Sequence, residues 1–167
     1  SEAFTKGVHA ITPSQRQIPA QFLDPKVKNR SRLHYRLAEL EVKRADSSAW
    51  ALLLDDQGYI AEGSGSNFFI VQGDRLITPE PRNCLRGISR NYVLGLAREL
   101  GIDYRERNLE LYDTINADEA FFTGTPFCIM PVSRFNCTQI GRAAPGEVTQ
   151  QLISTWSEKV GCDFVEQ

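Results

Sequence analysis

Hydrophobic positions along the chain recur with two spacings, one typical of helices and the other of short strands. Apolar residues recur every three or four positions over three stretches, and each is expected to be a helix. These stretches are 30–44, 89–100 and 147–160. One side of the first carries Leu33, Leu37 and Leu40. Gly101 and Gly161 follow the other two, where a glycine commonly ends a helix.

Between these helices the chain consists of short apolar runs separated by turn signals such as Gly58 and Gly73. Strands are expected at 49–54, 59–62, 67–71, 75–78, 103–109, 119–123 and 129–135, with a hairpin partner near 140–141 and a short helix or turn at 111–117. Residues 1–24, interrupted by Pro13 and Pro19, are expected to be extended or irregular. Many hairpin strands with about three helices indicate an α+β fold.

Composition narrows the class of protein. A chain of 167 residues suits one domain, and its net charge of −2 gives no electrostatic reason to bind nucleic acid or an anionic membrane. No apolar run approaches the length of a membrane span. The four cysteines form no Cys-x-x-Cys pair and only two histidines accompany them, so no metal site is expected. Reduced cysteines in a cytoplasmic protein are the expectation.

Two lysines ahead of the first predicted helix are candidates for covalent chemistry. Lys26 and Lys28 lie two positions apart, just before residue 30. An amine that bonds to a carbonyl compound must be partly shielded from water and held in place. Most lysines are simply solvated, and the local pattern does not choose between these two.

A glutamate beside a run of small residues is the second candidate. Glu62 precedes Gly63–Ser66, which ends at Asn67. A carboxylate can hold the proton on a pyridine nitrogen so that the ring withdraws electrons. Small residues let a flat ring approach the backbone. An exposed glutamate at a strand end is the alternative. A strand is expected after these glycines, so they do not indicate a dinucleotide-binding loop.

Two further segments could bind an anion. Gly87–Ser89 opens the second predicted helix, whose free N–H groups favour negative charge, and Ser89 adds a hydroxyl. Thr123–Thr125 ends a strand with a glycine between two hydroxyls, which suits a second clamp on a phosphate. An ordinary helix cap and an ordinary turn are the alternatives. Arg90 is expected to pair with another side chain rather than with a ligand.

Taken in order, these segments resemble the class IV aminotransferases, which are fold type IV pyridoxal-phosphate enzymes. That group includes the branched-chain and D-amino-acid aminotransferases and aminodeoxychorismate lyase. The resemblance extends over almost everything after residue 24. The matching segments are Pro25–Asn29, Gly58–Phe69, Thr78–Pro79, Leu85–Arg90, Ala117–Thr125, Pro131–Val132 and Pro145–Thr149.

The resemblance implies a domain arrangement. Residues 25–167 would be the larger, C-terminal domain that binds pyridoxal phosphate, built on a hairpin-rich mixed sheet that curls like a barrel. Residues 1–24 would be a lead-in, the remnant of an interdomain segment. The family's N-terminal domain, absent from this chain, is implied to supply an arginine to the phosphate and part of the substrate pocket.

The resemblance also implies roles for seven residues. Lys28, rather than Lys26, would bond covalently to the cofactor and then move a proton between substrate and cofactor. Glu62 would face the pyridine nitrogen. The other implied roles are ring-face contact for Leu85, phosphate binding for Ile88, Ser89 and Thr125, and bracing of the small-residue loop for Asn67.

Three positions depart from the family pattern. Ser89 stands in place of a threonine and keeps the hydroxyl. Leu33 stands where the branched-chain enzymes carry a tyrosine, five residues after the lysine, and Tyr35 follows two positions later. Pro126 stands where those enzymes usually have alanine, and proline has no N–H to offer a substrate carboxylate.

The expected function is therefore pyridoxal-phosphate-dependent transamination between an amino acid and a 2-oxo acid. Branched-chain amino acids are the leading expectation for the substrate. The alternatives are a lyase of the aminodeoxychorismate type and a truncated domain without catalysis. The expected partners are these small molecules and a second copy of the chain, because family members are dimers.

Overall fold

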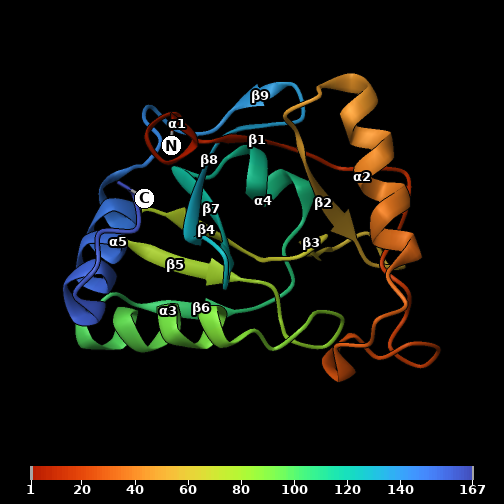
Figure 1. The fold of residues 1–167 in the computed structure, drawn as a ribbon, viewed down its shortest axis with the longest axis horizontal. Coiled ribbons are helices and arrows are strands. Elements are labelled where there is room, and N and C mark those ends of the chain that lie inside the picture. Colours follow the sequence, from red (N-terminus) through yellow and green to blue (C-terminus); the bar gives the residue numbers. More distant parts are fainter. Residues whose placement is uncertain (1, 167) are drawn as a thin grey trace.

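The structure, a computed structural model, describes residues 2–166 and confirms the α+β fold (Figure 1). The helices are α1 (Glu2–Lys6), α2 (Leu33–Ala45), α3 (Ile88–Glu99), α4 (Leu111–Ile115) and α5 (Glu147–Val160), with a 3-10 turn at Pro25–Val27. The strands are β1 (Val8–Ile11), β2 (Trp50–Leu54), β3 (Ile60–Gly63), β4 (Asn67–Gln72), β5 (Arg75–Thr78), β6 (Tyr104–Glu106), β7 (Glu119–Gly124), β8 (Cys128–Phe135) and β9 (Thr138–Gln139). Within the described range, three helices exceed one or two turns, as expected.

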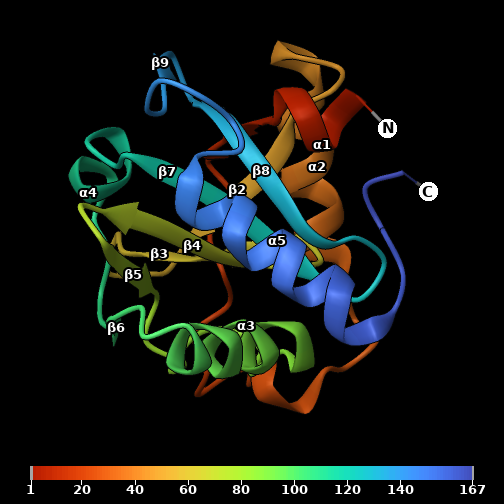
Figure 2. The ribbon, with the colours of Figure 1, turned by 90° about the vertical axis from the view of Figure 1, so that its left-hand side faces the viewer.

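The strands form one mixed sheet in the order β3-β2-β1-β8-β7-β4-β5-β6, with β9 paired to β8. The pairs β1–β2, β1–β8 and β5–β6 are parallel, and the others are antiparallel. The sheet curls into a half-barrel. Helices α3 and α5 cover one face of it, where they bury an apolar cluster against β4, β5 and β7 (Figure 2). A second cluster lies on the opposite face of the sheet, where it includes Phe68 and Ile70 of β4.

Residues 1–24 were expected to be extended or irregular, and this is wrong for residues 2–6, which form a helix, whereas residues 8–11 are extended and form a strand. These elements are α1 and β1, and β1 lies inside the sheet between β2 and β8. Ala10 pairs with Trp50 on one side and with Phe135 on the other. A four-residue strand gives little local periodicity, so its pairing was decided by partners distant in sequence. Residues 12–24 contain no helix or strand.

The leucines of α2 do not form its buried face. Leu33 is 69% exposed, and Leu37 and Leu40 are also exposed. The buried face carries His34, Tyr35, Ala38 and Val42, of which the last three pack against Ala49, Ala51 and Leu53. The small alanines on both elements let α2 approach β2 closely. Consequently the two aromatic rings near the start of α2 point into the molecule.

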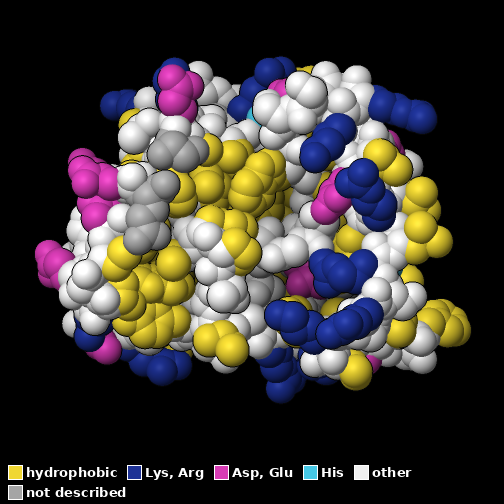
Figure 3. All heavy atoms as spheres, viewed as in Figure 1, with side chains coloured by type: hydrophobic (Ala, Val, Ile, Leu, Met, Phe, Trp, Pro, Cys, Tyr) yellow, Lys and Arg dark blue, Asp and Glu magenta, His cyan; other side chains and the backbone are white. Residues whose placement is uncertain are grey.

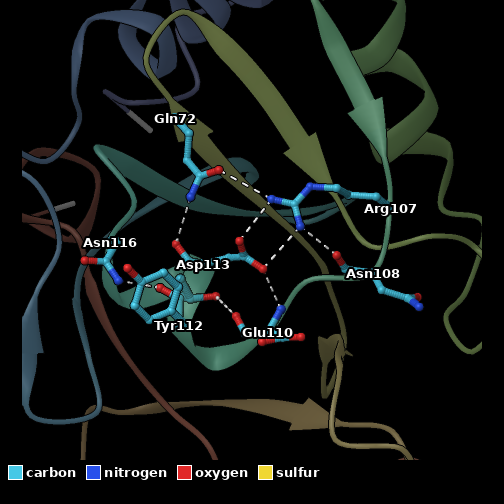
Figure 4. A network of polar contacts seen from close by, with 8 residues as sticks. Gln72, Arg107, Asn108, Glu110, Tyr112, Asp113 and Asn116 are labelled. Carbon is cyan, nitrogen blue, oxygen red and sulfur yellow. Dashed lines mark hydrogen bonds and ion pairs between the residues drawn. The ribbon is translucent and has the colours of Figure 1, made fainter.

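Two carboxylates fix the helices that follow β6 and β9. Glu119 on β7 accepts the backbone N–H groups of Val148 (2.9 Å) and Thr149 (2.8 Å) at the start of α5, and the Thr149 hydroxyl at 2.6 Å. Asp113 accepts the Glu110 N–H (2.8 Å) at the start of α4 and two hydrogen bonds from Arg107 (Figure 4). Among residues 2–166, no helix has both the length and the apolar character that crossing a membrane requires.

Candidate functional site

A cavity of about 500 Å³ opens between the start of α2, the end of β3 and the start of α3. Its volume lies in the range of small-molecule sites. All seven residues singled out from the sequence line it: Lys28, Glu62, Asn67, Leu85, Ile88, Ser89 and Thr125. Basic side chains also line it, and lysines and arginines gather on the side of the molecule that carries α2 (Figure 3). The structure therefore brings together segments that are up to about a hundred positions apart.

The surroundings of the two candidate lysines differ. Lys26 is held at the surface, because its Nζ lies 2.7 Å from Asp24 Oδ1 and 3.2 Å from the carbonyl oxygen of Arg82. Lys28 lines the cavity, and within the described chain its amine has no hydrogen-bond or ion-pair partner. Its backbone adopts the left-handed region (φ 51°), which is uncommon for a residue with a side chain. The geometry thus leaves Lys28, and not Lys26, available to a ligand.

Glu62 is a buried carboxylate surrounded by neutral donors. It is 4% exposed. Its Oε1 accepts hydrogen bonds from Tyr35 Oη (2.6 Å) and Gln17 Nε2 (2.7 Å), and its Oε2 accepts the Leu85 N–H (2.9 Å). Burial raises the pKa of Glu62, and the hydrogen bond from Tyr35 opposes that rise most strongly. Burial also raises the pKa of Tyr35, with the charge of Glu62 as the second cause. Tyr35 therefore remains a donor to Glu62.

A cysteine near this site is not a nucleophile. Burial raises the pKa of the Cys84 thiol to about 12, and the charge of Glu62 adds to the rise. A thiol with that pKa is almost fully protonated at neutral pH, and only the thiolate is strongly nucleophilic. The chemistry of the cavity thus does not involve this thiol.

The start of α3 is open toward the cavity. Its N-cap residue is Gly87, so no side-chain hydrogen bond caps the first turn. The Ser89 hydroxyl lies at the same end. The Asn67 Nδ2 donates to the carbonyl oxygen of Leu85 at 2.7 Å, and the bracing of the small-residue loop by Asn67 stays a prediction. Asn67 thereby holds the segment that leads into α3. Arg90 pairs with Glu106 at 2.6 Å, so the expectation that it binds another side chain is confirmed.

A buried hydroxyl without a hydrogen-bond partner bears on whether a phosphorylated ligand fits the cavity. Thr123 lines the cavity and is 1% exposed, yet within residues 2–166 its Oγ1 makes no hydrogen bond. Buried polar groups are normally paired. The unpaired hydroxyl, the uncapped helix start and the second hydroxyl of Thr125 form a donor set suited to an anion. A phosphorylated ring with a basic nitrogen therefore fits the residues that are present.

Sequence reasoning missed two residues of this site, Gln17 and Arg32, and one contact of a third, Tyr35. Gln17 carries no signal, because it lies in a segment without periodicity. Tyr35 was noticed, but its hydroxyl binds Glu62 rather than standing free for a ligand. Arg32 lines the cavity, and one of its guanidinium nitrogens donates to the Ser64 carbonyl oxygen. Their spacing of three residues at the start of the predicted helix would have placed Arg32 and Tyr35 near one another.

Comparisons with known proteins agree with this geometry. The family model described as amino-transferase class IV matches residues 1–135. A relative from Methanocaldococcus jannaschii is 41% identical over 147 residues, which are 87% of this chain and 51% of the relative. The branched-chain-amino-acid aminotransferase of Pseudomonas aeruginosa is 41% identical over 110 residues, 66% of this chain and 36% of that protein.

A solved structure has the same fold. The branched-chain amino acid aminotransferase of T.th. with pyridoxamine 5'-phosphate has a TM-score of 0.90 and 35% identity, covering 96% of this chain and 53% of that one. The same enzyme has been solved with N-(5'-phosphopyridoxyl)-L-glutamate and with 4-methylvaleric acid. The chain spans about half the length of the relatives that match most of it.

Proposed function

This chain belongs to the class IV aminotransferases, and on that premise we propose that it forms the cofactor-binding part of an aminotransferase that uses pyridoxal phosphate. The observation that carries the proposal is that three chemically distinct groups meet at one cavity. These are the unpaired amine of Lys28, the buried carboxylate of Glu62 and the uncapped start of α3 at Ile88.

Each group has a role in holding the cofactor. The Lys28 amine would bond to the cofactor's aldehyde carbon, and Glu62 would accept the N–H of its ring. The phosphate would lie at the start of α3, bound by the backbone there, by the Ser89 hydroxyl and by Thr125. Leu85 would lie against the ring face.

Bound pyridoxal phosphate supplies an electron-withdrawing ring that stabilises negative charge on the Cα of an amino acid. Glu62 favours that withdrawal, because a carboxylate next to the ring nitrogen holds a proton there. The Lys28 amine would be the base that moves a proton between the Cα of the substrate and the cofactor. Burial of Glu62 strengthens its interaction with a cationic nitrogen, since water does not screen it.

We propose branched-chain amino acids and 2-oxo acids as the substrates. The T.th. enzyme has been solved with 4-methylvaleric acid, which has the carbon skeleton of leucine without its amino group. Pro126 lines the cavity here and offers no N–H to a carboxylate. Arg32 and Arg86, which also line the cavity, have the charge to bind that group instead.

We further propose that the enzyme is a cytoplasmic homodimer. Large apolar side chains around the cavity are exposed, among them Phe22, Val27 and Ile88. Apolar side chains that are exposed together on a surface are commonly covered by another chain. Cys84, Cys128 and Cys137 are free thiols, as in proteins of reducing compartments. Analytical ultracentrifugation of the purified protein tests the dimer.

Borohydride trapping tests the cofactor site. The protein is incubated with pyridoxal phosphate, reduced, digested and mapped by mass spectrometry. We expect one phosphopyridoxyl group on Lys28, its loss in Lys28→Ala, and its retention in the matched control Lys26→Ala. Label on Lys26, or spread over surface lysines, would contradict the proposal.

An acceptor assay separates transamination from lyase chemistry. An aminotransferase forms the ketoacid of leucine only when a 2-oxo acid accepts the amino group. A lyase releases its product from aminodeoxychorismate with no acceptor. Product formation without any 2-oxo acid would therefore favour the lyase.

A further inference from the structure

Gln17 connects the segment after β1 to the carboxylate of the cavity. Its side chain is buried, with 2% exposed, and its backbone N–H donates to the Leu54 carbonyl oxygen at the end of β2 (2.8 Å). Its Nε2 lies 2.7 Å from Tyr35 Oη and 2.7 Å from Glu62 Oε1. Its Oε1 lies 3.0 Å from His34 Nε2. Both ends of this amide therefore have partners.

The donors and acceptors in this network determine which atoms carry the protons. The Gln17 carbonyl oxygen can only accept, so His34 carries a proton on Nε2. The Gln17 amide then donates one hydrogen to Tyr35 and the other to Glu62, and the Tyr35 hydroxyl donates to Glu62. Oxygen Oε1 of Glu62 thus receives two donors, which fill its two lone-pair sites and exclude a proton from it. His34 holds the amide in the orientation that this pattern needs.

The second carboxylate oxygen keeps one acceptor site open. Oε2 of Glu62 receives only the Leu85 N–H among the described residues. In the same range no lysine, arginine or histidine lies within ion-pair distance of this carboxylate. Arg32 stands over the Tyr35 ring at 4.5 Å instead. The Glu62 carboxylate is therefore surrounded by neutral donors. A cationic ligand in the cavity would be the group that neutralises its charge.

We propose that Gln17, oriented by His34, is a positioning residue that together with Tyr35 holds Glu62 ionised and keeps its Oε2 free for one cationic N–H donor of a bound ring. The identity of that ring rests on the proposed function. The arrangement of Gln17 and Glu62 is independent of the proposed function, because it is present in the chain without a ligand.

The titration of Glu62 in the ligand-free chain tests this role. Infrared difference spectra follow the carboxylic-acid stretch as a function of pH, and the band absent from Glu62→Gln assigns the signal. The other titratable or charged groups near Glu62 are Tyr35, His34, Arg32 and Cys84, and they are the same in every Gln variant. Loss of a donor to the charged form raises the midpoint.

Gln17→Leu should move the midpoint upward by about one pH unit. Tyr35→Phe, which keeps the ring in place, should move it in the same direction and provides the test if Gln17→Leu does not fold. The matched control is Gln15→Leu, because the Gln15 amide bonds only to the neighbouring Arg16 carbonyl oxygen; its midpoint should equal that of the parent. A midpoint unchanged in Gln17→Leu and Tyr35→Phe would overturn the inference.

A binding measurement links this role to the cavity. Gln17→Leu should weaken pyridoxal phosphate binding about tenfold and leave the binding of inorganic phosphate unchanged, because Glu62 is the partner of the ring and not of the phosphate. Equal losses for both ligands would show a general structural effect and refute the positioning role. A parent chain that fails to bind pyridoxal phosphate contradicts the proposed function alone, and the infrared shift still decides the role of Gln17.

Discussion

Replacing Gly87 by alanine is expected to destabilise the chain by about 1–3 kcal/mol through one steric conflict. The backbone of Gly87 (φ −62°, ψ 143°) suits alanine, so no backbone strain enters. A Cβ there would lie closer than 3.0 Å to Oδ1 of Asn67, a separation that real Cβ atoms essentially never show. Asn67 is 5% exposed and its Nδ2 donates to the Leu85 carbonyl oxygen, so moving it sacrifices that hydrogen bond and leaves a buried donor unpaired.

A double-mutant cycle isolates this conflict. Urea unfolding, followed by tryptophan fluorescence, gives the free energy of unfolding for Gly87→Ala, Asn67→Ala and the double variant. In the Asn67→Ala background the added alanine should cost less than about 0.5 kcal/mol, because the obstructing atom is gone. The matched control Gly95→Ala, inside α3 with open space around it, should stabilise by about 0.5–1 kcal/mol. An equal penalty for Gly87→Ala in both backgrounds would refute the reasoning.

Three other substitutions test separate parts of the structure. Thr123→Val should leave the ligand-free stability unchanged or higher, because the lost hydroxyl has no partner, yet weaken pyridoxal phosphate binding about tenfold in a fluorescence titration. Glu119→Gln should cost about 2–3 kcal/mol in urea unfolding by breaking the cap of α5, whereas the exposed Glu147→Gln should cost under about 1 kcal/mol. Asp113→Asn should cost about 1 kcal/mol at pH 7. The pKa of Asp113 is lowered chiefly by Arg107, so its stabilisation is complete above about pH 4 and lost as the pH falls through the folded-state value; the difference from the parent must shrink in acid.

Elements governed by local signals could be predicted from the sequence. Glu147–Val160 and Arg75–Thr78 were predicted with the bounds that the structure gives them. In the first case a Pro-Gly pair precedes the helix and Gly161 ends it in the left-handed region (φ 65°). In the second, a Gly-Asp turn precedes the strand. Such signals act over a few residues, so they do not depend on contacts with distant parts of the chain.

Features decided by distant partners could not be predicted. The leucines that gave α2 its helical periodicity are exposed, and β2 packs against the alanine side instead because small residues allow closer approach. β1 was missed because its partners Trp50 and Phe135 lie far along the chain. The seven candidate site residues were named through a family resemblance, since each one alone had a commoner explanation. Gln17 belongs to no such motif, and only the folded chain brings it to Glu62.

The position of β1 also bears on the order in which the molecule assembles. In the hydrogen-bonded order of the described strands, β1 is the link between the pair β3–β2 and the rest of the sheet. Its second partner, β8, ends at Phe135. During synthesis, therefore, both edges of β1 can be paired only after more than a hundred further residues have left the ribosome. Such long-range parallel pairing is slow, so we expect β1 to join the two parts of the sheet late in folding.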